Sequence, residues 1–367
     1  MDGFSAGVAA SVPVPGHVRY VVPGGDPGEA ASFLVDALID PVNLLVLFAG
    51  GLALAVGVGG YLRARPARAD LRTLRAALEG YRDLLPWLVR LSVGLPLVGA
   101  GFIGYVFTPV VGVDAVAALI GDALAADALV RLAGVGLGFL LLFGLATRAV
   151  AAVGLLTYLA ALAAFGPALL FAFEYVPGFL AAILLGGGRP SADHVLARLA
   201  DDDRTVYSRI DPVYRELAVP FERRIVPYRA YVPTVVRAGL GATFVFLGVA
   251  EKLLAPAYAL AAVEKYDLTA VVPVSPELWV LGAGLGEVLV GTLLIAGLLT
   301  RAFAAVALGL FTLTLFGLPD DPVLAHVSLF GLASLLIVTG AGPLSLDWRL
   351  AETDSAADPE REPSPAD

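Results

Sequence analysis

Long uncharged apolar runs alternate with short charged segments along most of the chain, and this alternation constrains the fold more than any other feature. The first run, at 42–62, is long enough to cross about 30 Å of hydrocarbon at about 1.5 Å per residue. Because 58% of the 367 residues are hydrophobic and only 16% are charged, a string of soluble domains is excluded. The sequence therefore predicts an all-α polytopic membrane protein embedded in a lipid bilayer.

Hydropathy predicts about nine transmembrane helices. One extra helix comes first, and the remaining eight follow in two groups of four that are separated by a polar segment. The predicted spans lie at 42–62, 86–107, 129–146, 149–166, 168–186, 233–254, 278–299, 302–318 and 323–341.

The distribution of arginine predicts the orientation of these spans. Segment 63–85, directly after the first span, carries six arginines, and the positive-inside rule places it in the cytoplasm. The gaps at 108–128, 255–277 and 319–322 contain no arginine and fall on the opposite side. We therefore expect a multi-pass protein of the cell (cytoplasmic) membrane, with its N-terminus outside and its C-terminus in the cytoplasm.

Composition excludes several classes of function. The chain has no cysteine, so it carries no disulfide, iron–sulfur cluster or thiol redox centre of its own. Of its three histidines, His17, His194 and His326, only His326 sits inside an apolar run, which argues against a bis-histidine haem and predicts no metal site. The net charge of −9 argues against nucleic acid as a partner. Only two of the 24 basic residues are lysines, a bias that together with the acidic tail indicates a halophilic source.

The chain contains an internal duplication. Segments 87–109 and 234–256 align, and two further pairs of segments align in the same order, the last pair ending at Asp193 and Asp347. The matches predict two tandem four-helix units. The predicted organisation is an extracytoplasmic segment (1–40), an extra transmembrane helix (41–62), a basic cytoplasmic linker (63–85), a diverged four-helix unit (86–193), a cytoplasmic linker (194–231), a second four-helix unit (232–347) and a disordered acidic tail (348–367).

The linker at 194–231 has two interpretations. In the first, its amphipathic helical pieces lie on the membrane surface. In the second, it is a solvated connector without an activity of its own, since no site motif occurs in it.

The duplication separates residues that serve the fold from candidates for function. The charged residues found in both copies are Arg90 with Arg237, Arg148 with Arg301, and Asp193 with Asp347. Because they lie at the cytoplasmic ends of the spans, we expect a structural role for them. They act either as snorkelling arginines or as ion pairs such as Arg301 with Asp347.

The ionisable residues found only in the second copy are Glu251, Lys252, Glu287 and His326. Glu287 lies about midway along its span, where a charge costs at least about 2.5–3.5 kcal/mol, and Gly134 stands in its place in the first copy. The topology predicts that the four side chains surround one cavity open to the outer side, suited to a quinone or another small amphipathic ligand. In the alternative, Glu287 pairs with Lys252 or His326 and only ties helices together. Glu174 of the first copy lies close to the position of His326 and is a candidate remnant of the same site.

The second unit resembles the DoxX family of four-helix membrane proteins. The resemblance rests on Arg237 followed by FLGVAEKLLAP, on GAGLGEVLVGTLLIAGLLTR ending at Arg301, and on the terminal GAGPLSLD. It covers about 230–347, and the first unit, at about 84–193, looks like a diverged member. The resemblance implies a membrane subunit or accessory of a redox or quinone-linked system, with quinone as the candidate cofactor and a redox or respiratory protein as the candidate partner.

Two functions from different classes are left open. The first is a redox-linked subunit that binds a quinone or similar carrier in the second unit, with any redox centre on a partner. The second is a non-catalytic scaffold or assembly factor, in which the polar residues pack helices and the 194–231 linker docks a partner. A secondary transporter is less favoured, because both copies have the same orientation and an inverted repeat is absent. Each function is compatible with a monomer or a homo-oligomer.

Overall fold

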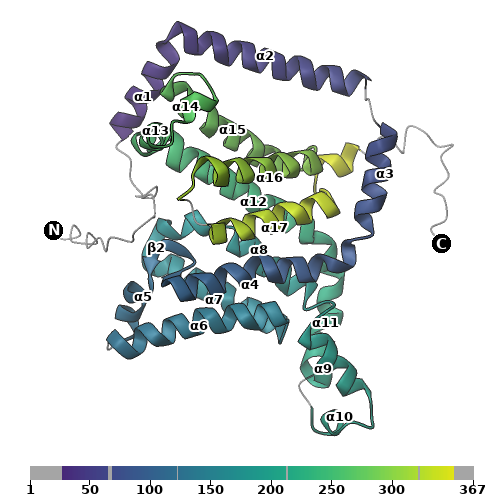
Figure 1. Ribbon diagram of the computed structural model, residues 1–367. Helices are drawn as coiled ribbons and strands as arrows, with labels where there is room; N and C mark the ends of the chain where they lie inside the picture. Colours follow the sequence, from purple (N-terminus) through teal and green to yellow (C-terminus); the bar gives the residue numbers. More distant parts are fainter. Residues whose placement is uncertain (1–26, 65–67, 122, 212–213, 321–322, 351–367) are drawn as a thin grey trace, which may run out of the picture.

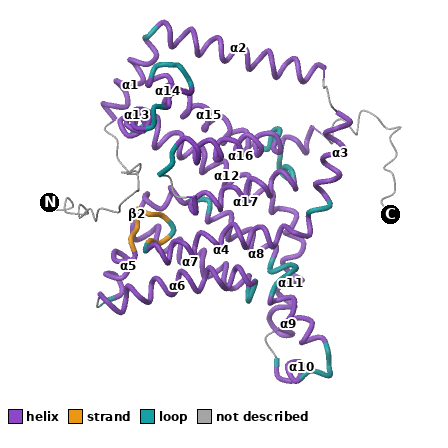
Figure 2. The backbone as a smooth tube through the Cα atoms, viewed as in Figure 1, coloured by secondary structure: helices purple, strands orange, loops and turns teal. Residues whose placement is uncertain are grey.

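The structure, a computed structural model, describes residues 27–64, 68–121, 123–211, 214–320 and 323–350. His17 and most of the predicted N-terminal segment and acidic tail lie outside these ranges. Nearly all described residues belong to helices, most of which run alongside one another in a bundle (Figure 1). The pair of short strands within the described ranges is drawn in orange in Figure 2. The prediction of an all-α polytopic membrane protein is confirmed.

The elements fall into four consecutive groups. An N-terminal arm contains α1 (Pro27–Ile39), α2 (Pro41–Ala64) and α3 (Arg68–Glu79). The first half contains η1 (Arg82–Leu84), α4 (Leu85–Ile103), β1 (Tyr105–Val106), β2 (Thr108–Gly112), α5 (Val113–Ile120), α6 (Ala123–Phe143), α7 (Thr147–Phe165), η2 (Gly166–Ala172) and α8 (Tyr175–Leu185). A lobe that projects from the bundle contains α9 (Ala192–Asp201), α10 (Val206–Ile210), η3 (Tyr214–Ala218), α11 (Val219–Ile225) and η4 (Val226–Tyr231). The second half contains α12 (Val232–Leu247), η5 (Gly248–Leu253), α13 (Pro256–Lys265), α14 (Leu268–Val271), α15 (Pro276–Ala296), α16 (Thr300–Gly317) and α17 (Val323–Thr339).

Seven helical segments of the described chain are long and apolar enough to cross a membrane, and they overlap seven of the nine predicted spans. The other two predicted spans, at 168–186 and 323–341, contain the shorter apolar helices α8 and α17. Helix α8 is short because the chain first passes through the 3-10 segment η2, whose first residue, Gly166, has a φ of 66°. Each predicted span therefore has an apolar helical segment in the described part of the chain, but two of these segments are shorter than the sequence predicted.

Helix α2 is the predicted extra transmembrane helix, and it stands apart from the bundle. Only 6% of its most apolar stretch is buried, and it runs along the top of the molecule in Figure 1. Its neighbour α1 holds it in place, because Phe33 of α1 packs against Val263 of α13 and Val280 of α15. At the start of α2, Asn43 Oδ1 accepts a hydrogen bond of 3.0 Å from the hydroxyl of Ser275.

The two halves interlock through their first and last helices. Helix α4 packs against α17, and α12 packs against α8. The contacts are equivalent, since Ser92 lies against Gly331 in one and Gly239 lies against Pro177 in the other. Counted from the duplicated arginines and aspartates, Ser92 corresponds to Gly239 and Pro177 corresponds to Gly331. Each half thus contributes its first and last helix to a common core.

Glycines make a close helix crossing within each half. A Cβ added to Gly241 of α12 would lie 2.5 Å from the carbonyl oxygen of Gly291 in α15. In the first half, a Cβ added to Gly94 of α4 would lie 2.9 Å from the carbonyl oxygen of Gly138 in α6. Small residues at such positions let two backbones approach in a membrane, where packing drives association. The same crossing therefore recurs at corresponding positions of the two halves.

A β-hairpin that the sequence did not predict closes the first half at the end of the bundle opposite the lobe (Figure 2). Strands β1 and β2 pair around Phe107, which has a φ of 61°. The Phe107 ring lies edge-on to the rings of Tyr158 and Tyr175, at 5.2 and 5.1 Å between ring centroids. Because this aromatic contact is buried, it anchors the strained turn to the core.

Candidate functional site

The duplicated aspartates cap the helices that follow a tight turn. Asp193 accepts hydrogen bonds from the backbone N–H groups of Ala146 and Thr147, at 2.6 and 2.9 Å. Asp347 makes the same contacts with Leu299 and Thr300, at 2.7 and 2.9 Å. These N–H groups begin α7 and α16 and would otherwise lack partners. The two carboxylates are therefore helix caps contributed by distant parts of the chain.

The duplicated arginines bind backbone carbonyl groups at the same end of the bundle. Arg90 donates to the carbonyl oxygens of Gly187 and Pro190, both at 2.7 Å. Arg237 donates to those of Ala341, at 3.0 Å, and Leu344, at 2.5 Å. It also donates to Ile295. In each case the guanidinium satisfies carbonyl groups left open at a helix end or turn.

Arg148 and Arg301 repeat this pattern one helix further along the chain. Arg148 donates to the carbonyl oxygen of Ile183 at 3.1 Å, and Arg301 donates to that of Ile337 at 3.0 Å. The sequence suggested an ion pair between Arg301 and Asp347, but each of these side chains instead uses its polar atoms on backbone groups. The physical reason is that a buried backbone carbonyl or N–H group at a helix end costs free energy if it lacks a hydrogen bond. Charged side chains that bind such groups remove this cost.

Three of the four residues that set the second half apart form one cluster. Lys252 Nζ lies 3.0 Å from Glu287 Oε2 and 3.4 Å from Glu251 Oε2. The three side chains are 18–23% exposed, so the cluster is sheltered but reachable. The contact with Glu287 is an ion pair without an aligned hydrogen bond, and Glu287 Oε2 has no hydrogen-bond partner among the described residues. This oxygen is itself buried, so the exposed part of the cluster belongs to other atoms.

Local backbone structure brings the cluster together. Glu251 and Lys252 lie on η5, a short π-helical segment that continues α12, and Glu287 lies on α15. Helix α15 meets η5 closely because Gly248 and Gly284 face each other, and a Cβ on Gly284 would lie 3.1 Å from the Cβ of Lys252. Short π-helical segments inside α-helices are rare and occur frequently at functional sites.

His326, the fourth predicted residue, lies against the aromatic side chains that α12 and α16 share. It sits on α17, and its ring centroid is 6.4 Å from that of Phe311 on α16. Helix α17 packs mainly on α4, α16 and α12, whereas α15 packs mainly on α12 and η5. Phe311 in turn stacks on Phe244 of α12, seven residues before Glu251. Ion pairs join Glu251, Lys252 and Glu287, and the inclusion of His326 in the same site stays a prediction.

The first half has a different polar arrangement at the corresponding place. By the alignment of the two copies, Gly104 and Tyr105 replace Glu251 and Lys252. Arg131, at the position of Gly284, pairs with Asp127 on its own helix at 2.9 Å. It also donates to the carbonyl oxygen of Phe102 at 3.3 Å. The first half therefore lacks the cluster and uses an exposed arginine to cap α4.

Glu174, which the sequence suggested only as a remnant, is the most deeply buried carboxyl group of the described chain at 5% exposure. Its Oε1 accepts a hydrogen bond from Ser328 of α17 at 3.3 Å, and its Oε2 has no partner among the described residues. Counted back from Asp193 and Asp347, Glu174 and Ser328 occupy corresponding positions. The duplication could have identified this pair, which joins the two halves where they interlock.

An ion pair outside the spans links the end of α13 to the turn that follows α16. Lys265 of α13 donates to Asp320 Oδ2 at 2.8 Å, and the hydroxyl of Tyr266 donates to the same oxygen at 3.1 Å. The hydrogen bond from Lys265 lowers the pKa of Asp320, and the same contact raises the pKa of Lys265. Because the pKa of Asp320 is lowered in the folded chain, its contribution to stability is present at neutral pH and is lost as the pH falls through that lowered pKa.

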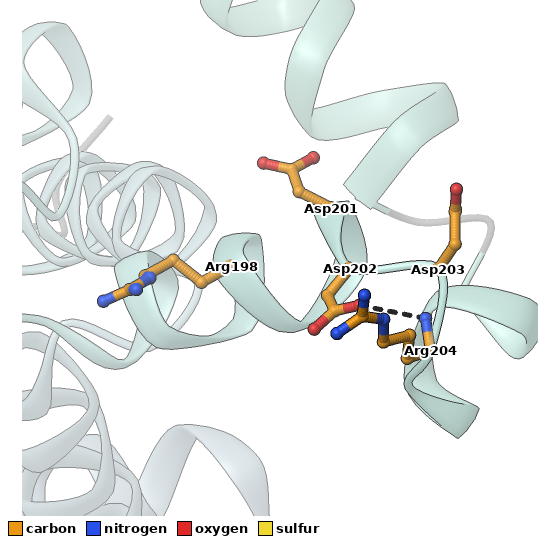
Figure 3. A pocket seen from close by; sticks show the side chains of 5 residues that line it. All are labelled: Arg198, Asp201, Asp202, Asp203 and Arg204. Carbon is orange, nitrogen blue, oxygen red and sulfur yellow. Dashed lines mark hydrogen bonds between the residues drawn. The ribbon is translucent and has the colours of Figure 1, made fainter.

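A pocket of about 570 Å³ lies away from the cluster, in the lobe. Figure 3 shows the charged side chains that line it, and the backbone N–H of Arg204 donates to Asp202 at 3.0 Å. The lining residues are Arg198, Asp201, Asp202, Asp203 and Arg204. All five are exposed, and none is apolar, so this pocket differs from the apolar site that an amphipathic ligand requires. Within the described ranges, no group of three or more histidine, aspartate or glutamate residues could hold a metal ion.

The fold and the cluster together define a polytopic α-helical membrane protein with two interlocked halves and one ionisable cluster in its second half. The comparison with protein families adds that residues 232–326 match the DoxX family model. The predicted resemblance of the second unit is therefore confirmed. The match runs from the first residue of α12 to His326, so it includes the whole cluster. Comparison with curated proteins and with solved structures gives no match.

Proposed function

We propose that the second half binds a small amphipathic ligand with hydrogen-bonding oxygens, a quinone being the candidate, and that the protein serves as an accessory or subunit of a quinone-linked redox system. The observation that carries this proposal is the cluster of Glu251, Lys252 and Glu287 at membrane depth. Holding three ionisable groups there is costly, and such groups usually mark a functional site. Because the chain has no cysteine, redox chemistry is assigned to the ligand and to a partner protein.

The polar atoms of the cluster match both forms of a quinone. The Lys252 ammonium can donate to a quinone carbonyl oxygen, and the Glu287 carboxylate can accept from the hydroxyl of a hydroquinone. The exposed fraction of each side chain, 18–23%, leaves room for such a contact at the edge of the bundle. Glu251 balances the charge of Lys252 when Glu287 is engaged by a ligand.

A scaffold function is the second candidate, and one observation favours it. The ion pair between Lys252 and Glu287 joins η5 to α15 beside the close approach of Gly248 and Gly284. In this interpretation the pair strengthens a helix crossing, and the protein acts by holding a partner in the membrane. The two functions make different predictions for a substitution that removes the ion pair but keeps the side-chain shape.

We expect Glu287→Gln to weaken binding of a short-chain ubiquinone analogue at least about tenfold, equivalent to about 1.4 kcal/mol. The reason is that the amide loses the negative charge while Lys252 keeps Glu251 as its partner. Binding is measured by quenching of tryptophan fluorescence in the purified protein, since Trp279 lies on α15 with Glu287. Thermal unfolding in the same detergent is expected to change little.

The matched control is Asp320→Asn, which makes the same acid-to-amide change at the other lysine ion pair. It is expected to leave quinone affinity unchanged. If the unmodified protein shows no saturable quenching, or if Glu287→Gln loses stability and affinity together, the scaffold function replaces the quinone-binding one. Proteins that co-purify in mild detergent would then identify what it holds.

We also propose that the protein lies in the cytoplasmic membrane with its N-terminus outside and the lobe in the cytoplasm. The supporting feature is the arginine-rich segment 63–85, together with the arginine-free loop at 108–121 at the opposite end of the bundle. Because the chain has no cysteine, Asp114→Cys and Asp202→Cys each give a single labelling site on an exposed residue. A membrane-impermeant maleimide added to intact cells is expected to label Asp114→Cys only, and the reverse result would invert the topology.

A further inference from the structure

The lobe carries exposed apolar side chains that the bundle does not cover. Three of its helical segments each present two exposed aliphatic or aromatic side chains four residues apart, which places each pair on one helix face. The pairs are Val195 and Leu199 on α9, Val206 and Ile210 on α10, and Leu217 and Phe221 on η3 and α11. Their exposure is large, 71% for Val206, 70% for Ile210 and 66% for Leu217. Exposed apolar clusters of this kind mark an interaction surface.

The root of the lobe is fixed at the level of the helix ends. Glu222 of α11 pairs with Arg229 of η4 at 2.7 Å and with Arg148 at 3.6 Å. Arg148 is the second residue of α7, so α11 lies where this membrane span begins. From there the lobe extends sideways, beyond the end of α6, rather than along the direction of the spans (Figure 1). A segment in that place runs beside the membrane surface.

Exposed arginines accompany each apolar pair. Arg198 adjoins Leu199, Arg209 adjoins Ile210, and Arg223 follows Phe221 by two residues. Guanidinium groups bind phosphate oxygens well because their N–H donors match that geometry. Apolar side chains flanked by arginines, on helices at the membrane boundary, are typical of segments that lie in the interface between headgroups and acyl chains.

We infer that the lobe rests on the phospholipid surface beside the bundle, with the three apolar pairs inserted at the boundary of the acyl chains and the arginines at the lipid phosphates. The exposed acidic turn of Asp201, Asp202 and Asp203 then faces water. The lobe is in this case a peripheral membrane anchor of the full protein and not a free docking arm.

The test uses full-length protein in vesicles of phosphatidylcholine and phosphatidylglycerol. Single-cysteine variants Leu199→Cys, Ile210→Cys and Leu217→Cys are labelled with the environment-sensitive fluorophore NBD, and Asp203→Cys is the matched control within the same lobe. We expect lipids carrying a spin label on the acyl chain to quench the first three labels several-fold more than the control. The replaced side chains are exposed, so the variants keep the fold, which size-exclusion chromatography checks.

Equal quenching at Asp203→Cys and at the three apolar positions would overturn the inference. So would labels at those positions that stay in water, or that become shielded only when another protein is added, since the surface would then belong to a protein partner. Vesicles of phosphatidylcholine alone separate the two contributions. Insertion that persists there assigns the binding to the apolar pairs, and insertion lost there assigns it to the arginines and the anionic headgroups.

Discussion

Arg237→Met is expected to lower the stability of the protein by at least about 3 kcal/mol or to prevent the second half from folding. Arg237 is 2% exposed and donates to the carbonyl oxygens of Ile295, Ala341 and Leu344. Methionine fills a similar volume but donates no hydrogen bond, and each buried carbonyl left unpaired costs about 1–3 kcal/mol. The measurement is the yield of monodisperse protein and its unfolding temperature in detergent.

Two variants control this experiment. Arg75→Met removes an arginine whose side chain is 64% exposed and which makes a single surface ion pair with Glu79, so we expect almost no change. Arg237→Lys keeps the charge but replaces five fixed donors by one compact ammonium, so an intermediate loss is expected. If Arg237→Met unfolds at the same temperature as Arg75→Met, these carbonyl contacts do not stabilise the second half.

The importance of this arginine could be predicted from sequence, but its partners could not. Arg90 and Arg237 were identified because both copies of the duplication keep them. Their partners are backbone carbonyl groups of Gly187, Ala341 and similar residues, which any amino acid supplies equally. The sequence identifies charged side chains but not which backbone groups lie near them. It therefore suggested an ion pair for Arg301, whereas in the structure Arg301 donates hydrogen bonds to backbone carbonyl groups.

The sequence predicts which residues form the candidate site better than it predicts which of them pair. The order of helices places Lys252 and His326 near the outer ends of their spans and Glu287 about midway along its span. It does not say which helices are neighbours, and the interlocking of the halves brings α17 against α4 as well as against α12 and α16, so His326 lies next to Phe311. Glu174 was undervalued for the same reason, since its contact with Ser328 exists only across the two halves.

The elements that hydropathy missed lie where the two copies differ. The hairpin around Phe107 follows α4, and the π-helical segment η5 follows α12. Helices α4 and α12 are themselves equivalent in the two halves. Both segments contain apolar residues, so a hydropathy profile includes them in the spans formed by α4 and α12. Short local features of this kind depend on tertiary packing, such as the edge-on rings of Tyr158 and Tyr175 around Phe107.

Gly241→Leu is expected to have an effect as large as that of Arg237→Met. A Cβ at this position would lie 2.5 Å from the carbonyl oxygen of Gly291, and because the neighbour is backbone, it cannot move aside by changing a rotamer. Overpacking in ordinary cores costs about 1–3 kcal/mol, and forcing α12 and α15 apart is expected to cost at least the upper end of that range. The measurement is again the yield of monodisperse protein and its unfolding temperature.

Gly59→Leu in α2 is the matched control, because nothing lies within 4 Å of a Cβ added there, and we expect it to insert and unfold like the unmodified protein. Equal stability of Gly241→Leu and Gly59→Leu would show that the glycine crossing does not hold the second half together. The milder Gly241→Ala connects this crossing to the candidate site. Since η5 continues α12 and carries Lys252 while α15 carries Glu287, separating the two helices must lengthen the 3.0 Å ion pair. A protein that stays folded with this change is therefore expected to lose quinone affinity before it loses stability.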